Sequence, residues 1–280
     1  IQFFAKDFQA PLIHQYDVIV QHQIARNTVV SVSYIGSTGR NLPTFFDLNY
    51  QQTGVNTFLV SGGPADGQVF SLPTYGRVVG NQSLTQIRST VKSQYNALVL
   101  QANRRFTNGL QFQASYTLSK STDTNQNSAT FTQTNSPFDI FDESYDRGLS
   151  NFDRKHKFVV SAVYAPNPYK GSKNSFYNYL LNGWSIAPIY TFYSGAPFSG
   201  TVSATLNNTF GNNQFPLFER NSFRLPNLHN FDLRLSKRFK LTESVNLELL
   251  GEAFNVFNRT HVFSVTNTLY NRGNIVANQP

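Results

Sequence analysis

A strict alternation of apolar and polar residues constrains this chain more than any other feature of its sequence. The clearest example runs from residue 110 to residue 119. Successive side chains of an extended strand point to opposite faces, so this segment would present one apolar face and one polar face. The apolar set is Leu110, Phe112, Ala114, Tyr116 and Leu118, and the polar set is Gln111, Gln113, Ser115, Thr117 and Ser119. A strand of this kind separates hydrocarbon from water.

Seven further segments can be interpreted as strands, which gives eight in all. Most are close to the length of about 9 to 11 residues that a tilted strand needs to cross a bilayer. The eight segments are 15–22, 28–35, 96–106, 110–119, 157–164, 184–193, 230–239 and 245–254. Asn108-Gly109, between the third and fourth segments, is a strong hairpin signal.

The connections between these strands alternate between short and long. Short ones follow His22, Phe106 and Phe239, and one of medium length follows Tyr164. The long ones, 36–95, 120–156 and 194–229, are rich in Asn, Thr, Ser, Gly and Pro. Short periplasmic turns opposite long extracellular loops are typical of outer-membrane barrels. We therefore predict an all-β, antiparallel, up-and-down transmembrane β-barrel, present in part, with long extracellular loops.

Eight strands with loops of this size are too few to close, so we expect an open curved sheet with two exposed edges. A soluble β-sandwich is the weaker alternative, because it gives no reason for long and short connections to segregate.

Aromatic residues are abundant, with 26 Phe, 14 Tyr and one Trp, although the mean hydropathy is only −0.33. Aromatic rings of membrane barrels collect in girdles where lipid meets headgroups. Outward-facing aromatic residues do cluster near both ends of the predicted strands. The outer girdle would contain Tyr16, Tyr34, Tyr116, Phe192 and Phe231, and the inner girdle Phe106, Tyr164, Trp184 and Phe239.

The opposite parity predicts the face that lines the lumen. Its clearest members are Gln111, Gln113, Asp232, Arg234, Arg238, Glu248 and Glu252. Such a row could line a solute path, but cross-strand bonding in a wet barrel interior is the more common role, and we favour it.

Three residues depart from the pattern. Arg104 and Lys237 have lipid-facing parity, and we expect their long side chains to reach the headgroups near the periplasmic end. Pro188 cannot donate to the ladder, so we expect a bulge or a locally interrupted pairing there.

Catalytic and nucleic-acid functions find little support. There is no cysteine, the five histidines lack metal-ligand spacing, and no phosphate loop or nucleophile elbow is present. The net charge of +8 comes from basic residues scattered along the chain, which does not suggest a nucleic-acid interface. We predict that the chain is not an enzyme and binds no cofactor.

One acidic cluster lies in the second long loop. Its members are Asp139, Asp142, Glu143 and Asp146. Oxygen ligands at this spacing could hold a calcium ion, but a solvated loop segment is the more common role and the one we favour. Aromatic residues of the loops could touch a solute or pack loop against loop, and their sequence pattern does not separate the two roles; they include Phe45, Phe46, Phe131, Phe138, Phe141 and Phe198.

Several short motifs occur in a characteristic order. They include residues 105–110 (RFTNGL), 114–121 (ASYTLSKS), 151–156 (NFDRKH), 194–198 (SGAPF), 230–233 (NFDL) and 252–258 (EAFNVFN). This ordered set resembles the C-terminal barrel of the large TonB-dependent receptors called Oar-like. The resemblance is good over about residues 90–265 and extends to the first third only in pattern.

This resemblance implies a barrel of about 22 strands with a plugged lumen. It also implies energy coupling through a plug domain and an inner-membrane TonB complex. We expect residues 1–280 to be one partial barrel domain without the plug or the closing C-terminal strand. The implied function is that of a receptor or transporter in the bacterial outer membrane, in contact with lipid and with an unknown large solute. The alternative is a structural or adhesive barrel that does not transport.

Overall fold

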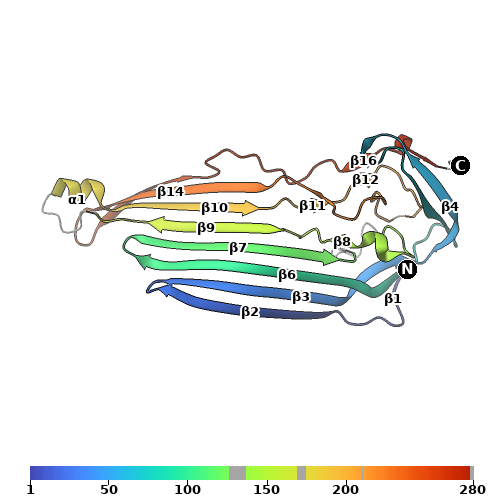
Figure 1. The fold of residues 1–280 in the computed structure, drawn as a ribbon, viewed down its shortest axis with the longest axis horizontal. Helices are drawn as coiled ribbons and strands as arrows, with labels where there is room; N and C mark the ends of the chain where they lie inside the picture. The colour runs from blue at the N-terminus through green and yellow to red at the C-terminus, as the bar shows by residue number, and fades with distance from the viewer. Residues whose placement is uncertain (126–136, 169–174, 210, 278–280) are drawn as a thin grey trace.

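Eight long strands form one open curved sheet in the computed structural model, which describes residues 1–125, 137–168, 175–209 and 211–277 (Figure 1). Their order in the sheet is β2-β3-β6-β7-β9-β10-β14-β15, and all neighbours on this path are antiparallel. The bounds are β2 Leu12–Ala25, β3 Thr28–Asp47, β6 Thr85–Thr107, β7 Leu110–Asp123, β9 His156–Tyr164, β10 Trp184–Tyr193, β14 Leu228–Lys240 and β15 Asn246–Ala253. All eight predicted strands are present, so the all-β, antiparallel prediction is confirmed.

The sheet does not close on itself. Strands β2 and β15 lie at its two ends, and within the described residues they do not pair with each other. The predicted open sheet with two edges is therefore confirmed. No helix of the described chain is long and apolar enough to cross a membrane.

Tight turns connect the strands at one end of the sheet, which we call the turn end. Asn108 and Gly109 join β6 to β7 with φ of 52° and 77°, and two positive φ values are the requirement of a type I′ hairpin. Helix α1 (Ser175–Leu181) lies between β9 and β10 and projects beyond the strands at this end (Figure 1).

The opposite end, the loop end, is more ordered than predicted. Segment 36–95, expected to be a loop, contains the continuation of β3, the start of β6, and the hairpin of β4 (Tyr50–Val60) and β5 (Val69–Arg77). Short strands link the other loops: β1 (Gln2–Phe4) pairs with β6, β8 (Gly148–Leu149) with β7, β11 (Pro197–Phe198) with β13 (Phe223–Arg224), β12 (Thr201–Val202) with β16 (Thr268–Tyr270), and β17 (Ile275–Ala277) with β4.

The hydrophobic core lies in these connected loops, which we call the loop cap, and not beneath the sheet. Its larger cluster joins β4 and β5 to chain segments around residues 138, 202–215 and 270–275. Its smaller cluster contains Phe46, Tyr50, Tyr75 and Ile140. Phe112 and Tyr116, on the wall, are only partly buried, so no second protein layer covers them.

Pro188 interrupts one ladder, as expected. Its pairing with β14 is continuous, but on the β9 side the paired positions stop at Ile189 and resume at Ile186 without a change of register. Proline has no N–H to donate, which explains the gap.

Candidate functional site

The register brings apolar side chains of all eight strands to the same face of the sheet. One row of paired residues runs through Val20, Val32, Leu100, Tyr116, Phe158, Phe192 and His229. The neighbouring row on the other face runs through Gln21, Ser31, Gln101, Ser115, Val159, Thr191 and Asn230. We call these the apolar face and the polar face.

Both faces of the sheet carry exposed side chains, but in residues 31–34 of β3 and 97–100 of β6 the apolar face is the more open of the two. On the apolar face, Val32 and Leu100 are 46% and 40% exposed. On the polar face, Ser31 and Ala97 are only 8% and 2% exposed. Large apolar side chains are thus open to the surroundings on this face, which suits contact with hydrocarbon.

The residues predicted to line a lumen lie on the polar face, and four of them form ion pairs between neighbouring strands. Arg234 contacts Glu252 at 2.6 Å and Arg238 contacts Glu248 at 3.2 Å, between β14 and β15. Asp232 accepts hydrogen bonds from Asn230 and from the backbone N–H of Asn255. Gln113 pairs in register with Ser161, and Gln111 with Val163. Both ion pairs therefore join neighbouring strands on the polar face.

Hydrogen bonds orient several of the predicted girdle tyrosines. The hydroxyls of Tyr16 and Tyr34 both donate to Asn96 Oδ1, at 3.3 and 2.9 Å. The hydroxyl of Tyr116 lies 2.8 Å from His156 Nδ1. A similar tyrosine–histidine contact, Tyr190 with His229, was not anticipated, because each histidine is far from its tyrosine in sequence.

Lys237 does not reach outward as predicted. It is 4% exposed, and its ammonium donates to the backbone carbonyls of Tyr179, Leu180 and Asn182 at the end of α1. A lysine carries three N–H donors, and here each has a carbonyl partner. Arg104 keeps the predicted parity, opposite Thr28 and Phe112.

The acidic cluster does not form a cation site. Asp139 accepts from the Tyr75 hydroxyl and from Phe141 N–H, and Asp142 accepts from Ser144 N–H. Across the described residues, no group of three or more candidate ligands gathers where it could hold a metal. Asp139 and Asp142 instead use their oxygens to hold neighbouring groups of the loop cap.

Like Asp139, Asp146 is a fully buried carboxylate. It is 1% exposed and accepts from Phe138 N–H at 2.8 Å and from Asn212 Nδ2 at 2.7 Å. Burial raises the pKa of Asp146 to about 6, and the two hydrogen bonds oppose this rise. Asp139 and Asp146 are therefore buried within protein and not solvated, contrary to the interpretation that we favoured.

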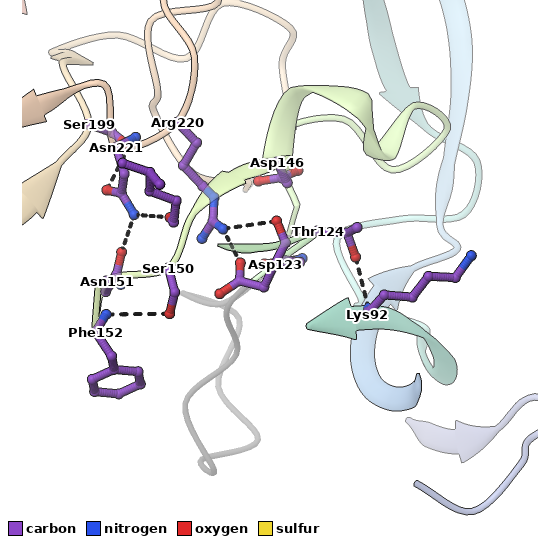
Figure 2. Close-up of polar contacts among 12 residues, drawn as sticks. Lys92, Asp123, Thr124, Asp146, Ser150, Asn151, Phe152, Ser199, Arg220 and Asn221 are labelled. Carbon is purple, nitrogen blue, oxygen red and sulfur yellow. Dashed lines mark hydrogen bonds and ion pairs between the residues drawn. The ribbon is translucent and has the colours of Figure 1, made fainter. Parts of the chain in front are cut away.

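A network of polar side chains joins the loop cap to the wall at the loop end (Figure 2). Asp123, at the end of β7, forms an ion pair with the buried Arg220. Burial raises the pKa of Asp123, and the nearby Arg220 guanidinium lowers it in part. Asn221 donates to Leu149 O and to Asn151 Oδ1, and its N–H donates to Ser199 Oγ.

A second ion pair in this network explains two of the sequence motifs. Asp153, in 151–156, accepts from Ser121 N–H and from Arg224 Nη2, at 2.7 and 2.6 Å. Arg224 in turn donates to the carbonyl of Gly195, in 194–198. We call the Asp123–Arg220 and Asp153–Arg224 contacts, with Asn221, the loop junction. The motifs did not predict which residues pair with each other, because the partners of Asp123 and Asp153 lie about 70 to 97 residues away in sequence.

A pocket of about 540 Å³ lies beside the loop junction. Its lining combines Tyr34, Leu98 and Leu118 with Lys120, Asp153 and Arg224.

The aromatic residues of the loops mainly pack against protein. Phe46 and Phe138 are buried in the two clusters of the loop cap, and Phe198 stacks on Phe223. Phe141 is largely exposed, although it contacts Tyr75. Phe131 lies outside the described residues.

Two solved transporter structures are similar to this chain. The outer membrane transporter YddB from Escherichia coli superposes with a TM-score of 0.57 and 12% identity, over 92% of this chain and 30% of YddB. At this identity the likeness shows the fold alone, and the chain spans about 30% of the length of YddB. The copper transporter OprC superposes with a TM-score of 0.43 and 12% identity, over 95% of this chain and 27% of OprC. No curated protein matches the chain in sequence.

A family comparison gives the firmer result. The family described as "Outer membrane beta barrel domain" matches residues 1–218 and again residues 207–279. The chain therefore belongs to the outer membrane β-barrel domain family, and its sheet is part of the wall of a barrel in the outer membrane.

Proposed function

We propose that residues 1–280 form a partial barrel domain of an Oar-like, TonB-dependent outer-membrane receptor or transporter. In this proposal the sheet is barrel wall and the loop cap meets a large solute for uptake or export. Coupling would pass through a plug domain to an inner-membrane TonB complex. Barrel wall needs no catalytic residues, so we propose no enzymatic activity and no cofactor.

One observation carries the proposal: exposed apolar side chains share one face across the eight strands, among them Val20, Leu100 and Leu249. Open apolar surface of this extent is unfavourable in water but favourable against lipid. The polar face, with its cross-strand ion pairs, would then line the lumen. The turn end would face the periplasm and the loop cap the outside.

The arrangement of the proposed outer girdle supports the placement of the sheet across a membrane. Along the paired rows, the aromatic residues move toward the turn end in steps from β2 to β14, with no shift between Tyr116 and Phe192, which share a row. The β3 residue paired with Tyr16 is Gly36, and Tyr34 lies two residues nearer the turn end. The row of Tyr34 reaches β7 at Leu118, and Tyr116 lies two residues nearer the turn end. Phe192 pairs with His229 on β14, and Phe231 again lies two residues nearer the turn end. Barrel strands are tilted, so a girdle parallel to the membrane must cross the rows in this way.

The proposed inner girdle shifts in the same sense. Trp184 lies two residues nearer the turn end than the partner of Tyr164, and Phe239 two nearer than the partner of Trp184. The two girdles therefore stay parallel, separated by eight residues on both β10 and β14. At a rise of about 3.4 Å per residue this is about 27 Å of strand, or roughly 20 Å of membrane at a tilt of about 40°. That thickness is close to the apolar band of about 25 Å in such barrels.

The transport proposal can be tested in cells that lack the protein. Three radiolabelled probes, a ferric chelate, an oligosaccharide and a peptide, would be offered to wild-type cells, to the deletion strain and to a strain without the TonB complex. We expect accumulation of one probe to fall in both mutant strains, and the gene to restore it in the deletion strain. Accumulation of all three probes that is unchanged by the deletion would contradict uptake of these classes of solute.

The structural or adhesive alternative predicts a different result. Loss of the protein would then reduce surface attachment, while the TonB-linked accumulation of every probe stayed at its wild-type value. Secretion of a solute, the export form of the proposal, would appear as depletion of one component from the medium of the deletion strain.

A further inference from the structure

Helix α1 exposes large apolar side chains at the turn end of the wall. Phe176, Tyr179 and Leu180 are 67%, 55% and 48% exposed, although the helix has only seven residues. Exposure of these large apolar side chains to water is unfavourable. Within the described residues, the wall covers them only in part.

A tether holds α1 to the wall. The last turn of a helix has carbonyl groups without intrahelical partners, and the end of the helix dipole favours a cation there. The ammonium of Lys237 donates to Tyr179 O at 2.9 Å, to Leu180 O at 3.2 Å, and to Asn182 O. The indole N–H of Trp184 donates to Leu180 O at 3.0 Å.

Gly183 allows the chain to turn sharply from α1 into β10. Its φ is 78°, a conformation that favours glycine, and a Cβ on it would lie 2.4 Å from the carbonyl oxygen of Arg238. The position of α1 is therefore set by Gly183, by Lys237 and by the ring contact of Tyr179 with Phe239 at 5.3 Å.

These contacts place α1 on the apolar face. Trp184 pairs directly with Lys237, and both share parity with Phe239 and with the apolar rows of β10 and β14. The exposed side chains of α1 thus continue the surface that meets lipid, at the level of the proposed inner girdle. Lys237, a cation on a lipid-facing row, is favourable here only because helix carbonyls satisfy it.

We propose that α1 is an interfacial anchor that inserts Phe176, Tyr179 and Leu180 into the headgroup–acyl boundary of the phospholipid leaflet at the turn end. Short amphipathic helices bind membranes in this way, with aromatic and leucine side chains at the boundary. The inference rests on the proposed function, because it requires the apolar face to meet lipid.

The test uses spin labels in the full-length protein reconstituted into phosphatidylethanolamine–phosphatidylglycerol vesicles. The chain has no cysteine, so single cysteines can be introduced by Leu180→Cys on α1, Leu100→Cys on the wall and Ser244→Cys in the β14–β15 turn. Collision of each label with oxygen, which concentrates in lipid, is compared with collision with a water-soluble nickel chelate.

We expect the oxygen-to-nickel ratio at position 180 to lie several-fold above that at 244 and below that at 100. A ratio at 180 equal to that at 244 would place α1 in water and overturn the inference. Protection of 180 from both reagents would mean that protein covers α1, which also overturns it. A water-like ratio at 100 would instead defeat the proposed function, so the two failures are distinguishable.

A second measurement tests the tether itself. In the protein labelled at position 180, Lys237→Met should increase the mobility of the label, because the helix carbonyls lose their partner. Lys240→Met, which removes a nearby exposed cation, is the matched control and should leave mobility unchanged. Equal mobility in the two variants would show that Lys237 does not hold α1.

Discussion

Single residues of the wall should tolerate charge according to the face on which they lie. Leu100 is on the apolar face, near the middle of β6, and Gln113 is on the polar face of β7. Leu100→Arg should destabilise the full-length barrel by about 2 to 4 kcal/mol, whereas Gln113→Arg should cost far less. Folding titrations in urea with lipid vesicles measure both, and equal losses would contradict the assigned faces.

The turn at Gly109 should lose stability when a single methyl group is added. Gly109 has a φ of 77°, and a Cβ there would lie 2.7 Å from the carbonyl oxygen of Ala165. Gly109→Ala should therefore lower the free energy of unfolding by at least about 1 to 2 kcal/mol, the cost of a left-handed conformation alone. Gly251→Ala is the control, because a Cβ at that position meets open space, and its unfolding free energy should not fall.

Loss of the Asp153 carboxylate from the loop junction should lower stability more than loss of the neighbouring Arg154 side chain. Asp153→Ala removes the acceptor of Arg224 and of Ser121 N–H, so we expect a loss of about 2 to 3 kcal/mol. Arg154→Ala removes contacts to backbone carbonyls only and should cost less. Hydrogen exchange of the Ser121 amide reports the difference, and similar exchange in the two variants would argue against a structural role for Asp153.

Among the elements, the loop cap should become less stable as the pH rises from about 4 to about 6. The folded cap raises the pKa of Asp146 from the usual 3.8 to about 6, so it binds this proton more tightly than an opened cap does. The protonated form therefore favours the closed cap, and this stabilisation, present in full below about pH 4, is lost as the pH rises through 6. The full effect is on the order of 3 kcal/mol.

Limited proteolysis of loop-cap segments at pH 4.5 and 7 measures this dependence. Cleavage should be slower at pH 4.5 after correction for protease activity, and Asp146→Asn should remove most of the difference. A cap that becomes more resistant as the pH rises would contradict the assigned role of Asp146.

The wall elements were predictable because lipid and water impose a two-residue period on each strand. The loop-end continuations of β3 and β6 were not, because protein covers parts of both faces there and the period fades: Thr44, Phe45 and Phe46 are consecutive and all buried. The tether of Lys237 also escaped prediction. Its partners are backbone carbonyls of a short helix. Every residue carries a carbonyl, so the sequence does not show which ones will accept a hydrogen bond.

For the whole molecule, the two edges of the sheet are the features that most favour association with other chains. Every residue of β2 and of β15 is exposed, and on its outer side each strand presents backbone N–H and C=O groups that pair with no other described strand. Unpaired edges are templates for further strands, and in a lipid-like environment each unsatisfied backbone group is costly. Chains that expose these edges should therefore pair with each other.

The 280-residue chain refolded alone in detergent micelles tests this expectation. We expect light scattering to show dimers and larger assemblies, and amide exchange in β2 and β15 to slow as assembly proceeds, since each new ladder satisfies groups that were open. Central strands β6 and β7, already paired on both sides, provide the internal control and should exchange at one slow rate throughout. A monomer whose β2 and β15 amides are already protected would contradict the open sheet, because protection without a partner chain requires the two edges to meet.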